Sequence, residues 1–179
     1  DADFGIKYNA SNGGPAPESL TEAIFQHSLK ISRYPILESP DVSLDECGET
    51  QLGDMVVEVI DPVVDYAECM EQLFDFDAIR ELIKQGKLSI CFDAMNAVNG
   101  PYAREILVAR LGAPLESLMR DKPLEDFGGV HPDPNLAHAQ ELLAVMSTDS
   151  APHLGAASDG DGDRNLILGA NFYVTPSDS

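Results

Sequence analysis

The sequence predicts an α/β fold with mixed, mostly parallel sheets and packed helices. Helical and strand patterns alternate along the chain, and two apolar runs flank a loop of glycines and aspartates near the C-terminus. The chain has 179 residues, of which 44% are hydrophobic, so it is long enough to bury a core of its own. We therefore expect layered α/β structure whose ligands collect at the carboxyl ends of the strands.

The first third of the sequence predicts one helix and one strand, separated by an acidic connection. Apolar residues recur at helical spacing after Pro17, and Pro35 stops the pattern. A polar stretch with many carboxylates then precedes a β-rich run that ends at Asp61, where we place a domain boundary. The expected parts are a helix at 18–33, a surface connection at 38–54, a strand at 55–60, and domains at 1–61 and 62–179.

The remaining two thirds continue the alternation. Asp77 is a typical helix N-cap and Gly86 a typical stop, so a helix lies between them. Pro101 and Gly112 bracket another helix, and Asp133 begins a further one. The expected elements are helices at 63–74, 77–85, 101–111 and 133–146, a strand at 87–92, a structural turn at 93–100, and strands on both sides of the aspartate loop.

Three aspartates in the run 158–165 (SDGDGDRN) carry the clearest chemistry in the sequence. Asp159, Asp161 and Asp163 alternate with glycines, and carboxylates this close repel one another unless a hard cation such as Mg²⁺ or Ca²⁺ lies among their oxygens. Arg164 follows directly and can direct two N–H groups toward a phosphate or a carboxylate. A metal and an arginine together suggest phosphate chemistry.

Two other interpretations of this loop fit less well. A calcium loop of the helix–loop–helix type begins with the same alternation, but it needs glycine at its sixth position and glutamate at its twelfth. Those positions hold Arg164 and Ala170 here. A solvated acidic turn would need neither three aligned aspartates nor apolar runs on both sides, and these features favour a loop held between strands.

Composition argues against several kinds of partner. The formal net charge is −20, with 31 acidic and 11 basic residues, so nucleic acids and anionic membrane surfaces are poor partners. The sequence has no apolar run of membrane-spanning length. Cys47, Cys69 and Cys91 match no zinc spacing, which predicts a reducing compartment and, for Cys91, a place in the core. Both chain ends resemble the interior of a domain, so we expect a piece of a longer protein.

Four stretches of the sequence resemble the α-D-phosphohexomutase family, and within it the phosphoglucomutases. The resemblance spans nearly the whole chain. It implies a four-domain enzyme that interconverts glucose 1-phosphate and glucose 6-phosphate through a phosphoserine and glucose 1,6-bisphosphate. By this resemblance 1–61 is the end of the first domain and 62–179 most of the second. The stretches are 3–9 (DFGIKYN), 11–18 (SNGGPAPE), 125–129 (EDFGG) with 131–136 (HPDPNL), and the aspartate loop with 175–178 (TPSD).

The resemblance also implies roles for individual residues. Asp159, Asp161 and Asp163 would bind Mg²⁺, Arg164 would contact the substrate phosphate, and Asp163 would also contact the sugar. Lys7 matches the family lysine that transfers a proton at the attacking and leaving hydroxyl groups. The implied partner is a hexose phosphate, and the parent is expected to be a monomer or weak dimer in the cytoplasm, with a plastid as the other option.

The sequence departs from the family at the nucleophile. The family's phosphoserine loop, Thr-Ala-Ser-His-Asn, does not occur here, and neither does its sugar-binding loop. Ser11 lies in a glycine–proline turn and Ser158 adjoins the metal loop, so neither is a good substitute. We therefore expect this chain alone to be inactive. The alternatives are a non-catalytic module that binds metal or phosphosugar, and a mutase for another hexose phosphate such as mannose phosphate.

The histidines are less informative than the aspartates. His131 could be a base or a metal ligand, but the surrounding glycines and prolines are more typical of a rigid elbow with a loop histidine. The sequence reveals no partner for His27, His138 or His153.

Overall fold

The structure is a computed structural model that describes residues 6–36, 38–175, 177 and 178. The chain forms two compact units, Asp1–Val57 and Glu58–Ser179. The assignment of 1–61 and 62–179 to two domains of the family stays a prediction. Among the described residues, no helix combines the length and the apolarity that crossing a membrane requires.

The first unit contains α1 (Glu18–Ser28), which begins directly after Pro17 as expected. The helix is shorter than predicted: the amides of Lys30 and Ile31 bond only three residues back, to the carbonyls of His27 and Ser28, so the α-helical pattern of hydrogen bonds does not continue. None of its residues is buried. The apolar stripe that predicted the helix is therefore exposed within this unit.

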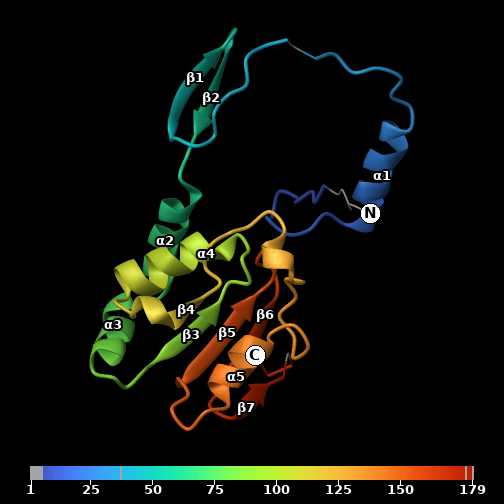
Figure 1. Ribbon diagram of the computed structural model, residues 1–179. Coiled ribbons are helices and arrows are strands. Elements are labelled where there is room, and N and C mark those ends of the chain that lie inside the picture. Colours follow the sequence, from blue (N-terminus) through green and yellow to red (C-terminus); the bar gives the residue numbers. More distant parts are fainter. Residues whose placement is uncertain (1–5, 37, 176, 179) are drawn as a thin grey trace. The chain divides into compact units, whose positions relative to one another are not determined.

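The predicted surface connection at 38–54 is partly wrong, because its end forms a strand. β1 (Gly48–Leu52) pairs with β2 (Met55–Val59) in a two-stranded sheet (Figure 1). The two strands are joined by Gly53 and Asp54, and Gly53 has a φ of +61°, which glycine adopts without strain. A Gly-Asp pair between two short extended runs is a sequence signal for a hairpin, and it accounts for the strand that was not expected at 48–52.

The second unit contains a five-stranded mixed sheet in the order β4-β3-β5-β6-β7. β3 is parallel to β4 and β5, whereas β6 is antiparallel to both β5 and β7. The α/β prediction with a mixed sheet is confirmed, although β4 and β7 were not expected. The bounds are β3 (Ile90–Asp93), β4 (Leu118–Met119), β5 (Leu154–Ser158), β6 (Asn165–Gly169) and β7 (Phe172–Val174).

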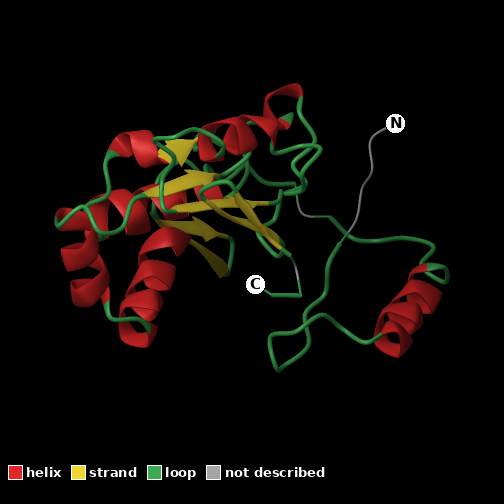
Figure 2. Cartoon of the chain, turned by 90° about the horizontal axis from the view of Figure 1, so that it is seen from below, coloured by secondary structure: helices red, strands yellow, loops and turns green. Residues whose placement is uncertain are grey.

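Helices lie on both sides of this sheet (Figure 2). Two predicted boundaries are corrected. The side chain of Asp75, not that of Asp77, caps α3 by accepting a 2.9 Å hydrogen bond from the amide of Ala78. The helix expected from 133 begins only at Gln140, because Asn135 holds the preceding segment in a turn. The helical elements are α2 (Pro62–Leu73), α3 (Phe76–Lys84), α4 (Asn99–Ala103), a π-helical segment at Arg104–Arg110, α5 (Gln140–Met146), and short 3₁₀ turns at Leu115–Ser117 and Phe127–Gly129.

The core of the second unit lies between α5 and one face of the sheet. Leu142 of α5 is fully buried, and burial of a side chain of this size contributes about 1.5–3 kcal/mol. A Cβ atom on Gly155 of β5 would lie 2.7 Å from the side chain of Met146, so glycine lets the helix approach the strand. Cys91 is buried here with 3% exposure, as predicted, and all three cysteines are free.

Candidate metal centre

The aspartate loop connects β5 to β6 at the carboxyl end of β5. Ser158 of β5 pairs with Asn165 of the antiparallel strand β6, so the loop closes a hairpin. The amide of Asp159 donates to the carbonyl of Arg164 at 3.3 Å, and the amide of Gly160 donates to the carbonyl of Pro132 at 3.2 Å. The loop is therefore anchored both internally and to the segment that precedes α5.

The structure brings the three predicted metal ligands together. Asp159, Asp161 and Asp163 each offer a carboxylate oxygen, and these oxygens lie within 4.8 Å of one another. Asp159 is buried with 1% exposure, whereas the other two are exposed. Small side-chain movements would bring such oxygens to the ~2.1 Å at which Mg²⁺ is coordinated.

Arg164 is held against the loop by carboxylates. Its backbone amide donates to Oδ1 of Asp159 and its Nε to Oδ2, both at 3.0 Å, while Nη1 donates to Oδ1 of Asp133 at 2.7 Å. Nε also lies 3.8 Å from Oδ1 of Asp163. The hydrogen bond to Asp159 is the main cause of a raised pKa for Arg164, so the guanidinium stays charged. It nevertheless keeps 60% of its side chain exposed.

Ser158 provides a test of whether Mg²⁺ fits this site. Its hydroxyl oxygen is buried and has no hydrogen-bond partner among the described residues. A buried hydroxyl is ordinarily satisfied by a protein group, water or a ligand. Ser158 directly precedes the three aspartates in the chain, and an unsatisfied hydroxyl at the start of the loop fits a hydrated hard cation, which brings its own water and prefers oxygen ligands.

A second buried aspartate lies at the end of the neighbouring parallel strand. Asp93, the last residue of β3, is fully buried and accepts two hydrogen bonds from the guanidinium of Arg120 and a 3.0 Å bond from the amide of Met95. The hydrogen bond to Asp93 is the main cause of a raised pKa for Arg120. A structural turn was expected at 93–100, and the residues of that turn do not by themselves predict this ion pair.

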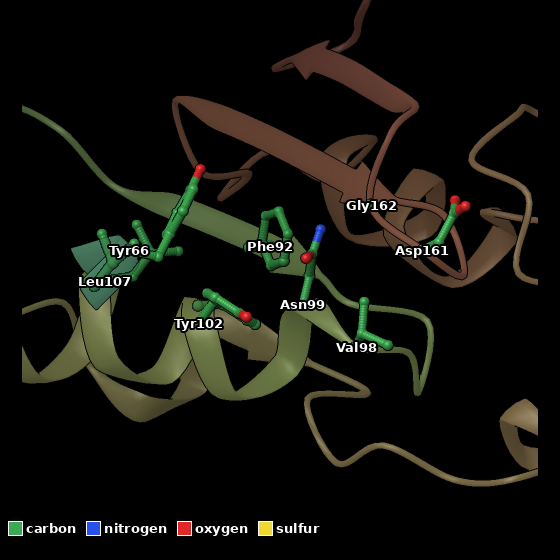
Figure 3. Close-up of a pocket in the computed structure, with 10 residues that line it drawn as sticks. Tyr66, Phe92, Val98, Asn99, Tyr102, Leu107, Asp161 and Gly162 are labelled. Atoms are coloured by element: carbon green, nitrogen blue, oxygen red, sulfur yellow. The ribbon is translucent and has the colours of Figure 1, made fainter. Parts of the chain in front are cut away.

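A cavity of about 510 Å³ borders the aspartate loop (Figure 3). Tyr66 and Tyr102 pack edge to face in its wall with ring centroids 5.3 Å apart, and Asp161 lies at its opposite end. The described residues that line it include no lysine or arginine, so the cavity does not suit a phosphate. The contact of Arg164 with a substrate phosphate stays a prediction.

Lys7 and the loop belong to different units. Lys7 lies in the first unit and is exposed, and its role in proton transfer stays a prediction. Residues 3–5 of its motif, and Pro176 of the 175–178 motif, lie outside the described residues. Ser11 is exposed in the turn that the bridge between Asn9 and Pro15 closes, as expected of a turn former.

Comparison with known families identifies the class of protein. The profile of "Phosphoglucomutase/phosphomannomutase, alpha/beta/alpha domain II" matches residues 64–171, which include strands β3 to β6 and the aspartate loop. The chain therefore belongs to the phosphoglucomutase/phosphomannomutase family, and the resemblance seen in the sequence is confirmed.

Several individual proteins similar to this chain are named phosphoglucomutases. The chain is 55% identical to a phosphoglucomutase from Rhizobium radiobacter and 54% identical to a chloroplastic phosphoglucomutase from Solanum tuberosum, over 99% of this chain but 32% and 28% of theirs. The crystal structure of pp63/parafusin (phosphoglucomutase) from Paramecium, in an open form, matches with a TM-score of 0.89 at 43% identity, over 97% of this chain and 33% of that one. The chain thus spans about a third of the length of these relatives. Relatives include chloroplastic and cytoplasmic forms.

Proposed function

We propose that the protein to which this chain belongs is a phosphoglucomutase, an isomerase that interconverts glucose 1-phosphate and glucose 6-phosphate through a phosphoserine and glucose 1,6-bisphosphate with Mg²⁺. The observation that carries the proposal is the convergence of three carboxylates and Arg164 at the end of β5, in a chain 55% identical to a phosphoglucomutase. The names of the relatives favour glucose phosphate over mannose phosphate as the substrate.

In this proposal Asp159, Asp161 and Asp163 hold the metal. Mg²⁺, when bound, would neutralise charge on the phosphoryl oxygens. Asp159 also holds the guanidinium of Arg164 through Nε, while Asp133 holds it through Nη1. A guanidinium has five N–H donors, so these two contacts leave donors with which Arg164 can bind a substrate phosphate. We also assign the sugar contact to Asp163, and its exposure and its position 3.8 Å from Nε of Arg164 support this role.

Other parts of the proposal concern the whole protein. Lys7 donates and accepts the proton of the reacting hydroxyl group, a role that a lysine with a tuned pKa can fill. The phosphoserine comes from a part of the protein outside this sequence, so the 179-residue chain alone does not turn over substrate. We further propose a cytoplasmic monomer or weak dimer, with a plastid as the alternative, that binds neither nucleic acid nor membranes.

The test is the mutase activity of the full-length protein with Asp161→Asn. This substitution should abolish Mg²⁺-dependent transfer while the circular dichroism spectrum stays that of the unchanged protein, because it removes one metal ligand and no buried group. Asp149→Asn is the matched control, since Asp149 is an exposed carboxylate of the same unit outside the loop. Unchanged turnover in the Asp161 variant would refute the proposal.

The remaining alternative is a module that binds a phosphosugar without catalysis. Such a module should bind glucose 1,6-bisphosphate well as the isolated chain in the presence of Mg²⁺. Our proposal expects weak or absent sugar binding by the isolated chain, since two thirds of the relatives' length lies outside it. Calorimetric titration of the 179-residue chain distinguishes the two, and detectable isomerisation by that chain would contradict the expected inactivity.

A further inference from the structure

Three side chains outside the aspartate loop form a second cluster of metal-ligating groups. His131, Asp133 and His138 each offer one ligand atom, an imidazole nitrogen or a carboxylate oxygen, and these atoms lie within 4.8 Å of one another. The two imidazole rings meet edge to face, with centroids 4.9 Å apart and planes inclined by 62°. Both histidines are exposed, and Asp133 is half-buried. The cluster is therefore open to a cation from solvent.

One side chain, that of Asn135, holds two of the three residues in place. Its Nδ2 donates to Oδ2 of Asp133 at 2.6 Å. Its Oδ1 accepts from the amides of Ala137 and His138 at 2.8 and 3.0 Å. The same asparagine thus fixes both the carboxylate of Asp133 and the backbone turn that carries His138.

The ends of the segment are fixed as well. Pro134 and Ala139 are buried, and the carbonyl of Pro132 accepts the amide of Gly160 from the aspartate loop. Proline at 132 and at 134 restricts the backbone on both sides of Asp133. The cluster is therefore built on an ordered turn, and ligand binding would cost little backbone entropy.

We propose that His131, Asp133 and His138 bind a divalent transition-metal cation, with Zn²⁺ as the expected ion. Two imidazoles and one carboxylate suit Zn²⁺, Co²⁺ or Ni²⁺, whereas Mg²⁺ prefers an all-oxygen set such as the aspartate loop. Tetrahedral Zn²⁺ with bonds of about 2.0 Å needs ligand atoms ~3.3 Å apart. The exposed rings reach this spacing by rotating, and a fourth position stays open to water.

Asp133 is hydrogen-bonded to Arg164 at the end of the aspartate loop, but it is not one of the three aspartates predicted to bind Mg²⁺ there. Its Oδ1 accepts a hydrogen bond from Nη1 of Arg164 at 2.7 Å, and its Oδ2 accepts one from the side-chain Nδ2 of Asn135. A carboxylate offers about four lone-pair positions, so a metal can bind beside these two donors. Hydrogen bonds of this kind orient a ligating carboxylate in metal sites generally. The inference depends on these contacts and not on the proposed mutase activity.

The test is calorimetric titration of the chain with Zn²⁺ in excess Mg²⁺, which keeps the aspartate loop occupied by the hard cation. We expect one Zn²⁺ per chain, with the affinity reduced at least tenfold by either His131→Gln or His138→Gln. His27→Gln, which changes an exposed histidine of α1, should leave the affinity unchanged. Circular dichroism of each variant verifies that the fold is retained.

A second readout uses Co²⁺ in place of Zn²⁺. Imidazole-ligated Co²⁺ of low coordination number absorbs visible light, so the chain should give an absorption band that His138→Gln and His131→Gln both remove and His27→Gln does not. The proposal is overturned if the unchanged chain binds no Zn²⁺ in excess Mg²⁺. It is also overturned if Zn²⁺ affinity and the Co²⁺ band survive both substitutions, which would place the ion elsewhere.

Discussion

Asp93 and Asp159 both lie at the carboxyl ends of neighbouring parallel strands, yet they form different kinds of site. Asp93 ends β3, and Asp159 follows the last residue of β5, the parallel neighbour of β3. Each is buried, and each accepts hydrogen bonds from an arginine. Arg120, the partner of Asp93, has 14% of its side chain exposed, whereas Arg164, the partner of Asp159, has 60% exposed.

The difference shows what makes a buried ion pair structural or functional. Asp93 and Arg120 satisfy each other away from solvent, so the pair offers nothing to a ligand and its loss would leave an uncompensated charge. Asp159 shares its arginine with Asp133 and lies among the further carboxylates of Asp161 and Asp163. The excess negative charge favours a cation, and the exposed guanidinium favours an anion. Four predictions test this comparison.

The largest effect is expected when the ion pair between Asp93 and Arg120 is broken. Asp93→Asn should reduce the free energy of unfolding by about 3–5 kcal/mol, because Arg120 would lose its counter-charge while buried. The matched change Asp159→Asn, measured without Mg²⁺, should cost less than about 1 kcal/mol, because Arg164 can turn to solvent. Urea denaturation of both variants measures the difference. If both variants lost the same free energy of unfolding, the two ion pairs would contribute equally to stability and the comparison would be wrong.

The next largest effect concerns metal binding by the aspartate loop. Mg²⁺ at a hundredfold excess over its dissociation constant should stabilise the chain by about 2.7 kcal/mol, because it binds only the folded loop. Asp161→Asn should remove most of this gain, while Asp149→Asn, outside the loop, should keep it. Thermal unfolding with Mg²⁺ and with a chelator gives the values. A gain that survives in the Asp161 variant would place the ion away from the loop.

A smaller effect is expected from a change in the backbone of the aspartate loop. Gly162 has a φ of +82°, and a Cβ atom there would lie 2.6 Å from Nδ2 of Asn99. Gly162→Ala should therefore cost about 1–3 kcal/mol and weaken Mg²⁺ binding. Gly112→Ala is the control, because Gly112 has a φ of +76° but no atom within 4 Å of the added Cβ. If the two variants lose the same stability and both bind Mg²⁺ normally, the approach of Asn99 does not shape the loop.

The smallest effect concerns the thiol of Cys91, whose pKa is affected by the charge of Asp93. Burial, and then the charge of Asp93, raise the pKa of the Cys91 thiol above its ordinary value. The folded protein therefore favours the neutral thiol, so this contribution to stability is full below the pKa of the unfolded thiol and is lost as pH rises through the higher folded pKa. Wild type should lose more stability than Cys91→Ala in alkaline solution, as measured by urea denaturation at several pH values. Parallel losses would mean that Cys91 has no part in the pH dependence.

Features set by neighbouring residues could be predicted from the sequence. The alternation of Asp159, Asp161 and Asp163 with glycine is local, and it predicted a loop between strands that the structure contains. The boundaries that failed depended on side chains near the elements. Asn135 bonds to amides two and three residues later and delays α5, and Asp75 competes successfully with Asp77 as a cap.

Pairings between distant residues could not be predicted in this way. Arg164 and Asp133 are 31 positions apart, and Arg120 and Asp93 are 27 apart. Either arginine could have been paired with any of the 31 acidic residues in the composition. The short strands β4 and β7 were not predicted for the same reason, because their pairing partners lie in other segments. Two or three residues are also too few to show the alternation of apolar and polar residues that indicates a strand.

The sequence by itself determined the α/β class, the aspartate loop and the family, because these follow from hydrophobic period and from residues adjacent in the chain. Only the tertiary structure decided which aspartate is buried, which arginine stays exposed and which histidines meet. Parallel strands place their carboxyl ends side by side whatever their separation in sequence. Burial at that edge then determines whether a charge is neutralised by the protein or left for a ligand.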